Sequence, residues 1–308
     1  MKQSENESTF SLPDDTPLAR ELADLNARKR RLADATVSFT GRTRVMTVSN
    51  QKGGVGKTTT TVNIAAAIAE FGGRVLVIDL DPQGNASTAL GVPHSADTPS
   101  IYDVLIDDFP IADVIQPSPE SENLFCAPST IHLAGAEIEL VSQVAREHRL
   151  KTALDTFLGS QDEPFDYILI DCPPSLGLLT INAFTAADEV FLPIQAEYYA
   201  LEGLSQLLGN IKMIQKHLNP RIHVSTILLT MFDQRTRLSQ QVGDEVRAHF
   251  PNEVLRTVIP RSVRVSEAPS FGQTVITYDG GSAGAVAYRE AAVEILSRAA
   301  AKNTEEKA

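Results

Sequence analysis

Long apolar runs are missing from this sequence of 308 residues. A membrane-spanning helix needs roughly 18 or more consecutive apolar residues, and no such run occurs, so we expect no membrane partner. The first residues are polar and acidic and lack the apolar core of a signal peptide. Hydrophobic residues still make up 43% of the chain and charged residues 21%, which indicates a soluble globular protein, expected in the cytoplasm.

Cysteine is scarce, and the chain has no excess of positive charge. The two cysteines, Cys126 and Cys172, have no spacing typical of metal ligands, and we expect both to be reduced, buried thiols. The formal net charge is −12, so the whole-chain balance does not suggest a nucleic-acid partner. A surface for nucleic acid would therefore need a local concentration of basic residues.

Residues 1–40 form a predicted N-terminal extension with its own composition. Residues 1–17 are rich in Ser, Glu, Asp and Pro, which predicts disorder. Residues 18–35 predict an amphipathic helix, because leucines recur at near-helical spacing beside the basic run Arg28–Arg31. Two interpretations of this helix stay open: a solvated extension, or a contact arm for DNA, a membrane or a partner protein.

From Gly41 onwards, apolar strands alternate with helices, which predicts one domain over residues 41–301 and a polar tail at 302–308. The predicted strands are continuous apolar runs, as parallel strands buried on both faces should be. They cover residues 44–50, 74–80, 167–172, 189–194 and 224–230. The predicted helices cover residues 57–71, 201–218, 239–250 and 283–300. This order predicts an α/β fold with a mainly parallel sheet and helices on both faces.

The strongest motif is the glycine loop, Lys52–Thr59, which reads KGGVGKTT between a predicted strand and a predicted helix. It is a variant of Gly-x-x-x-x-Gly-Lys-Thr, because a residue other than glycine occupies the first glycine position. Its glycines let backbone N–H groups turn towards phosphate oxygens, and the positive end of the helix points the same way. Lys57 can reach the β- and γ-phosphates, and the Thr58 hydroxyl can ligate Mg²⁺. The loop therefore predicts ATP and Mg²⁺ as cofactors.

Lys52 is not needed to shape a phosphate cradle. Its side chain could reach its own nucleotide, remain solvated, or extend to a nucleotide bound by a facing subunit. In the third case it would bring positive charge to the transferring phosphate only when two subunits meet, as an arginine finger does.

Three aspartates follow predicted strands of the sheet. Asp79 and Asp81 end the second strand, and Asp171 ends the third. Carboxylates at the carboxyl ends of parallel strands can hold Mg²⁺ through water or orient an attacking water, although each could instead cap the following turn. The adjoining segments Pro82–Gly84 and Pro173–Ser175 are candidate switch loops that sense a γ-phosphate.

Five motifs in order resemble the ParA/Soj group of chromosome-partitioning ATPases, within the wider deviant Walker A (MinD/ParA) family of P-loop proteins. They read QKGGVGKTTTTVNIA, VLVIDLDPQGNAS, YILIDCPPSLG, LLTMFDQRTRLS and IPRSVRVSEAPSFGQ. The resemblance covers about residues 43–300. The shortest family members have no counterpart of the 40-residue extension, so the resemblance implies nothing about its role.

The resemblance implies roles for residues of the glycine loop and the strand ends. Lys52 would contact ATP across a sandwich dimer, and Gly53 would lie where the subunits press together. Lys57 would bind phosphate, and Asp81 would be needed for hydrolysis. The implied Mg²⁺ ligands are Thr58, Asp81 and Asp171, and the further implied nucleotide contacts are Gly54, Val55, Gly56, Thr59, Pro260 and Arg261.

The resemblance also implies partners. These are non-specific double-stranded DNA, held by Arg235 and Arg264, a ParB-like centromere-binding protein that stimulates hydrolysis, and a second copy of the chain in an ATP-dependent dimer. Such a protein would associate with the nucleoid. The sequence supports DNA binding independently, because residues 221–264 contain seven arginines and four acidic residues, a local charge of +3 that leaves −15 for the rest. Arginine suits phosphate because it pairs in a planar, bidentate way, although an ordinary solvated face remains the alternative.

Three other functions share the same loop. A MinD-like membrane-associated positioning ATPase would need a C-terminal amphipathic helix with large apolar residues, and the end SRAAAKNTEEKA has none. An electron-transfer ATPase like the nitrogenase iron protein would need two exposed cysteines per subunit for a bridging cluster. A small-molecule kinase or synthetase would need an acceptor site, and no separate motif for one is evident.

Overall fold

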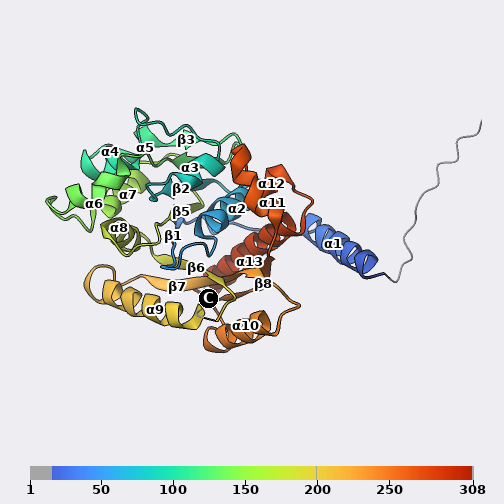
Figure 1. Ribbon diagram of the computed structural model, residues 1–308. Helices are drawn as coiled ribbons and strands as arrows, with labels where there is room; N and C mark the ends of the chain where they lie inside the picture. Colours follow the sequence, from blue (N-terminus) through green and yellow to red (C-terminus); the bar gives the residue numbers. More distant parts are fainter. Residues whose placement is uncertain (1–15, 199, 307–308) are drawn as a thin grey trace, which may run out of the picture. The chain divides into compact units, whose positions relative to one another are not determined.

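The computed structural model describes residues 16–198 and 200–306 of the chain (Figure 1). The chain divides into two compact units, residues 1–36 and 37–308. The strands are β1 Arg44–Val48, β2 Val75–Asp79, β3 Gln116–Pro117, β4 Leu124–Ala127, β5 Tyr167–Asp171, β6 Glu189–Gln195, β7 His223–Phe232 and β8 Val254–Pro260. The helices of the second unit are α2 Lys57–Glu70, α3 Asn85–Ala89, α4 Ile101–Ile106, α5 Ile111–Val114, α6 Leu133–Leu140, α7 Arg149–Gly159, α8 Leu178–Ala186, α9 Ala200–His217, α10 Arg237–His249, α11 Val263–Glu267, the 3₁₀ helix η1 Ala268–Phe271, α12 Val275–Tyr278 and α13 Ala283–Glu306.

Among the residues of the first unit that the structure describes, there is one helix, α1 (Pro17–Ala33). Thr16 caps its start, where its side chain accepts a hydrogen bond of 3.2 Å from the N–H of Ala19. This confirms the helix predicted over residues 18–35, with ends shifted by one or two residues. The disorder predicted for residues 1–17 falls almost entirely outside the described residues.

The second unit is built on one eight-stranded sheet with the order β3-β4-β2-β5-β1-β6-β7-β8. Every neighbouring pair is parallel except β3 and β4, which are antiparallel. Strand β1 lies centrally, between β5 and β6, while the next strand in the sequence, β2, lies on the far side of β5. The chain therefore changes direction across the sheet at the end of β1, and ligands of open parallel sheets bind at such points.

Two apolar layers cover the two faces of the sheet. Alternate residues of each strand point to opposite faces, so Val45 belongs to one layer and Met46 to the other. One layer packs against helices α4 to α10, and the other against α2, α3 and α11 to α13. This arrangement confirms the predicted mainly parallel sheet with helices on both faces.

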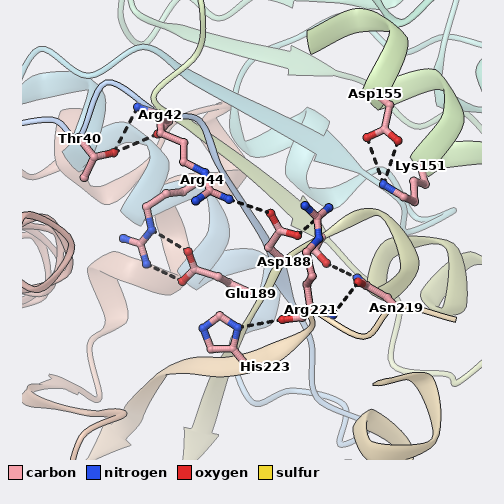
Figure 2. A network of polar contacts seen from close by, with 11 residues as sticks. Thr40, Arg42, Arg44, Lys151, Asp155, Asp188, Glu189, Asn219, Arg221 and His223 are labelled. Carbon is pink, nitrogen blue, oxygen red and sulfur yellow. Dashed lines mark hydrogen bonds and ion pairs between the residues drawn. The ribbon is translucent and has the colours of Figure 1, made fainter. Parts of the chain in front are cut away.

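Charged residues meet at the amino ends of β1, β6 and β7, at the edge opposite the glycine loop (Figure 2). Arg44 and Glu189 form a bidentate ion pair, with Nε–Oε1 and Nη2–Oε2 distances of 2.8 and 2.5 Å. Asp188 lies 3.1 Å from Arg221 and 3.8 Å from Arg42. These pairs join neighbouring strands far from the predicted site.

Several element boundaries differ from the predictions. Helix α13 continues to Glu306, past its predicted end at residue 300 and into the predicted polar tail. The second unit begins at Val37, and Val37 and Phe39 pack against its core. Strands β3, β4 and β8 were not predicted. Among the described residues, we find no helix that is both long and apolar enough to cross a membrane.

Candidate nucleotide-binding site

The glycine loop connects the carboxyl end of β1 to the start of α2. Gly54 and Gly56 have φ angles of 75° and 87°, in the left-handed region that side chains rarely adopt. Gly56 is also the N-cap of α2, and no side chain caps the helix there. The first N–H groups of α2 are thus left to a ligand, and the helix dipole favours an anion.

Lys57 is a buried lysine in the first turn of α2. Its Nζ lies 3.4 Å from the carbonyl oxygen of Lys52, so the side chain curls back under the loop. Burial lowers the pKa of Lys57, and the charge of Asp171 opposes that shift. A partly desolvated cation under a glycine-rich loop is suited to phosphate oxygens.

Asp171 receives two hydroxyl groups from α2. Thr58 donates a hydrogen bond of 2.7 Å to its Oδ2, and Thr61 donates one of 3.0 Å to its Oδ1. The parallel pairing of β1 with β5 sets this geometry, because Val48 and Asp171 are register partners at the ends of their strands. The predicted metal ligands Thr58 and Asp171 therefore lie together.

Asp79 and Asp81 occupy different positions. Asp79 is the register partner of Asp171, is fully buried, and accepts hydrogen bonds from the N–H and hydroxyl of Ser87 at 2.8 and 2.7 Å. Asp81 begins the following turn, where its Oδ1 accepts from the N–H of Gln83 at 3.0 Å. Asp81 thus caps a turn, which was the alternative to a catalytic role. Its charge is also among those that oppose the lowering of the Lys57 pKa by burial.

The two buried carboxyl groups at the strand ends have raised pKa values. Burial raises the pKa of Asp171 to about 8, and the charge of Asp79 adds to the shift. Burial raises the pKa of Asp79 to about 6, although the hydrogen bonds from Ser87 oppose it. A dication or a lysine brought close to Asp171 would reverse this effect by stabilising its charged form.

Lys52 stands at the exposed side of the glycine loop. Its Nζ lies 2.5 Å from Oε2 of Glu197, a residue just beyond β6, and Gln195 donates to the other oxygen of the same carboxylate. A Cβ added at the neighbouring Gly53 would have nothing within 4 Å, so this side of the loop is open. Sequence reasoning missed Glu197, since no motif links it to the loop.

The remaining predicted nucleotide contacts come from the start of α2 and the end of β8. The carbonyl of Thr59 accepts from Asn63, whose Oδ1 in turn accepts from the N–H of Val275 at the start of α12. Pro260 is the last residue of β8 and Arg261 follows it, at the same edge of the sheet as the glycine loop but three strands away from β1.

The predicted DNA-binding arginines lie at this edge too. Arg235 follows β7, is 90% exposed and pairs with Asp233 at 3.0 Å. Arg264 lies on α11, after β8, and pairs with Glu267 at 3.1 Å and Asp279 at 3.4 Å. The pKa of Asp233 is lowered chiefly by its hydrogen bonds from Arg235.

The seven arginines of residues 221–264 do not form one patch, which corrects the grouping by sequence. Arg221 precedes β7 at the opposite edge and pairs with Asp188. Arg247 lies in the last turn of α10, near Asp244. The arginines that directly follow β7 and β8 at the carboxyl edge are Arg235, Arg237, Arg261 and Arg264.

The site residues fit a magnesium nucleotide. The described residues contain no cluster of three or more His, Cys, Asp or Glu side chains that could cage a metal ion. Mg²⁺ does not require such a cage, since it commonly uses one or two protein oxygens together with water and phosphate oxygens. Thr58 and Asp171 supply such oxygens beside an open, glycine-rich turn. Both cysteines are buried, which leaves no ligands for an exposed cluster among the described residues.

Comparison with known proteins gives consistent matches over the second unit. Residues 43–224 match the AAA domain family. The chain is 53% identical over 252 residues to the sporulation initiation inhibitor protein Soj of Bacillus subtilis, covering 82% of this chain and 98% of that protein. It is 49% identical to the chromosome partitioning protein ParA of Caulobacter vibrioides, covering 83% and 94%.

Similar solved structures contain nucleotides and magnesium. Cobyrinic acid a,c-diamide synthase from Mycobacterium smegmatis, with bound ADP and magnesium, is 39% identical with a TM-score of 0.70, covering 83% of this chain and 94% of that one. The septum site-determining protein MinD from Pyrococcus horikoshii, complexed with Mg-ADP, is 26% identical with a TM-score of 0.66, covering 82% and 96%.

Proposed function

Because this chain belongs to the ParA/Soj group of chromosome-partitioning ATPases, we propose that it is an ATP-dependent dimerising switch that partitions a chromosome or plasmid. Its stimulating partner would be a ParB-like centromere-binding protein. The relatives with partitioning names reach 53% and 49% identity, above the 39% of the synthase structure, so the partitioning assignment takes precedence over a synthetase. The same comparison favours it over the MinD-like alternative, at 26%.

The hydrogen bond from Thr58 to Asp171 is the observation that carries nucleotide binding. It joins the end of β5 to the start of α2, where no side chain caps the first N–H groups of the helix. Thr58, Asp171 and Asp81 would hold Mg²⁺, which would supply positive charge to the β- and γ-phosphates. The glycine loop binds the phosphate chain through its N–H groups, and Lys57 contacts the β- and γ-phosphates. Thr59 reaches the α-phosphate, and the adenine lies near Pro260 and Arg261.

Hydrolysis requires a group that orients the attacking water. Asp81 is the proposed group, because it follows β2 at the sheet edge and lies near Lys57 without being fixed to it. Asp79 is less suited, since Ser87 holds its carboxylate in a fully buried position. The turn after Asp81, which contains Gly84 with a φ of 62°, would respond to loss of the γ-phosphate.

Lys52 would act across a dimer. Its ion pair with Glu197 is partly exposed, so only a modest free energy holds it within its own subunit. The open surface at Gly53 leaves room for a facing subunit. When two copies meet, Lys52 would leave Glu197 and contact the partner's phosphates.

DNA binding would follow dimerisation. Arg235 and Arg264 are exposed arginines that follow neighbouring parallel strands, and two such sets would meet the phosphates of one duplex. The protein would then reside on the nucleoid while it holds ATP.

The experiment that tests this function measures steady-state ATP turnover with Mg²⁺, alone, with DNA, and with DNA plus the cognate centromere-binding protein. We expect low turnover alone and at least about a tenfold rise with both additions, the order of magnitude that an added catalytic contact gives. Unchanged turnover in all three conditions would contradict the switch, and turnover that depends on lipid vesicles instead would favour the MinD-like alternative.

A further inference from the structure

Helix α6 (Leu133–Leu140) is apolar on two faces. Its inner face, with Leu133, Ala136 and Leu140, is fully buried in the core. Its outer face has Ile131, Ala134, Ile138 and Val141 at spacings of three, four and three residues, which places them on one side of a helix and its two flanking turns. An apolar face of a helix is normally covered by another part of the protein or by a partner.

The outer face of α6, defined by those four residues, is exposed. Ile131, Ile138 and Val141 are 66%, 79% and 59% accessible. Single exposed apolar side chains are ordinary, but three large ones on one side of a helix and its flanking turns are typical of an interaction surface.

The loop after β5 adjoins this face. Oε1 of Glu137, on α6, lies directly against Gly177, so that a Cβ added at Gly177 would overlap it. This oxygen is buried and has no hydrogen-bond partner among the described residues. The neighbouring Leu176 is another exposed apolar side chain. Helix α6 therefore contacts the segment that leads from Asp171, the proposed Mg²⁺ ligand.

The outer face of α6 shares a sheet edge with the glycine loop. Ile131 follows the carboxyl end of β4, Leu176 follows β5, and Lys52 follows β1. These strands and β2 are parallel neighbours, so all three residues lie at the carboxyl edge of the sheet.

We propose that the outer face of α6, together with Leu176, is covered by a second copy of this chain in the ATP-dependent dimer. The inference rests on the proposed function and names the surface by which the dimer forms. Each subunit has a net charge of −12, so long-range electrostatics oppose association of two copies. An apolar patch overcomes this because a two-fold interface can place the same patch of both subunits together.

The charges near the outer face of α6 also favour a second copy of the chain over DNA or a membrane. The face contains no basic residue, and acidic Glu137 and Glu139 lie on the same helix, which does not suit DNA or an anionic membrane. An apolar centre with charged residues around it is the usual composition of a protein interface. Its position beside the loop from Asp171 links it to nucleotide binding, as an ATP-dependent contact requires.

The test compares Ile138→Glu with Met213→Glu, a matched control on α9 that alters a 59% exposed apolar residue. Dimer formation is measured by analytical ultracentrifugation with ATP and Mg²⁺, and ATP binding by a fluorescent analogue. We expect Ile138→Glu to weaken dimerisation at least about tenfold while ATP binding stays within about twofold, and Met213→Glu to match wild type. The milder variant Ile138→Ser should show a smaller loss of dimer affinity. It tests the same surface if Ile138→Glu proves to be destabilised, with a lower melting temperature.

A crosslinking experiment gives an independent readout. Both native cysteines are buried, so Ile138→Cys introduces an exposed thiol for a short bis-maleimide reagent. We expect a covalent dimer with ATP and little with ADP. The proposal would be overturned if Ile138→Glu dimerised like wild type, or if Ile138→Cys crosslinked equally with ATP and ADP. It would also be overturned if Ile138→Glu formed a normal dimer and lost only the stimulation of its ATP turnover by the centromere-binding protein. If wild type fails to dimerise with ATP, the proposed function itself fails.

Discussion

Lys52 of the glycine loop and Glu197, beyond β6, form an ion pair with an Nζ–Oε2 distance of 2.5 Å. Both side chains are partly exposed, so the pair contributes at most about 1 kcal/mol. Glu197 therefore holds the Lys52 side chain in one orientation but does not prevent it from leaving. An exposed lysine with a weak internal partner, next to an open glycine, is suited to an exchange of partners when a second subunit approaches.

Replacement of Lys52 by alanine should impair dimerisation more than nucleotide binding. We expect ATP affinity within about threefold of wild type and at least about a tenfold loss of dimer affinity, since the contact across the subunits is charge-assisted. Equilibrium binding and ultracentrifugation measure the two quantities. Glu197→Gln is the matched control, because it removes the ion pair and keeps Lys52. An equal loss of both affinities in Lys52→Ala would indicate that this lysine serves its own nucleotide.

Replacement of Lys57 by alanine should abolish hydrolysis and weaken ATP binding by about tenfold or more, because the variant lacks a buried cation at the phosphates. Turnover assays and fluorescent-nucleotide titration would measure both effects. Lys151→Ala, on α7, is a suitable control, since this lysine pairs with Asp155 at the surface. If Lys57→Ala hydrolysed ATP at the wild-type rate, the assignment of the glycine loop to the active site would be wrong.

Replacement of Asp81 by alanine should separate binding from hydrolysis. We expect ATP binding and dimerisation to persist while turnover falls by about 10²-fold or more, the range for loss of a water-orienting group. Size-exclusion chromatography after incubation with ATP should then show a longer-lived dimer than wild type forms. A variant that stays monomeric with ATP would assign Asp81 to assembly or to the turn at Gln83 rather than to catalysis.

The local parts of the site could be predicted from the sequence. A glycine-rich turn between an apolar strand and a helix is typical of a phosphate-binding site. Aspartates that end parallel strands lie at one edge, because the carboxyl ends of parallel strands share that edge of the sheet. The contact between Thr58 and Asp171 follows from these two facts, although 113 residues separate them. The structure brings the predicted metal ligands Thr58 and Asp171 into contact, and their function stays a proposal.

Other contacts could not be predicted, because nothing local marks them. Glu197 lies 145 residues from Lys52, and Asn63 contacts Val275 across 212 residues. The sequence does not predict strand β8, because Arg256 and Thr257 interrupt its apolar run. Arg221 was grouped with Arg235 by sequence alone, yet the ends of β7 hold the two at opposite edges of the sheet.

The raised pKa values of Asp171 and Asp79 predict how stability depends on pH. In the folded protein these carboxyl groups have pKa values of about 8 and about 6, against an ordinary value of 3.8. Between pH 3.8 and these values the folded state binds more protons than the unfolded state, so the free energy of unfolding falls as pH rises. Without nucleotide, the urea midpoint should therefore decrease from pH 6 to pH 8, chiefly through Asp171.

The variant Asp171→Asn should flatten this decrease, because the amide does not titrate. Asp155→Asn, a surface carboxylate next to Lys151, should leave the pH dependence as in wild type. Urea denaturation at several pH values measures both. A midpoint that rises between pH 6 and pH 8, or the same slope in Asp171→Asn, would contradict the assignment.

DNA binding should require ATP, since one subunit presents few basic residues on a chain of net charge −12. Arg235, Arg237, Arg261 and Arg264 are the arginines that follow β7 and β8 at the carboxyl edge, and Arg235 and Arg264 already pair with acidic residues. DNA phosphates must replace Asp233, Glu267 and Asp279 as partners, which lowers the affinity of a single subunit. A dimer doubles the contacts on one duplex, and the second set binds at high effective concentration.

Arg264→Glu should therefore remove DNA binding while ATP-dependent dimerisation persists, and Arg235→Glu should act in the same direction but less strongly. Fluorescence anisotropy on two unrelated duplexes, with ATP, with ADP and across a salt series, measures the effect. Each arginine–phosphate pair lost should reduce the log–log salt slope by roughly 0.9, so Arg235→Glu, which alters both subunits of the dimer, should reduce it by roughly 1.8. Both duplexes should bind equally, because contacts to phosphate carry no sequence information. Arg221→Glu, at the opposite edge, is the matched control and should bind DNA as wild type does. Equal DNA affinity with ADP and ATP would show that DNA binding does not depend on the nucleotide switch. Wild-type DNA binding by Arg264→Glu would mean that another surface binds DNA, and the basic run Arg28–Arg31 of α1 would be the next region to alter.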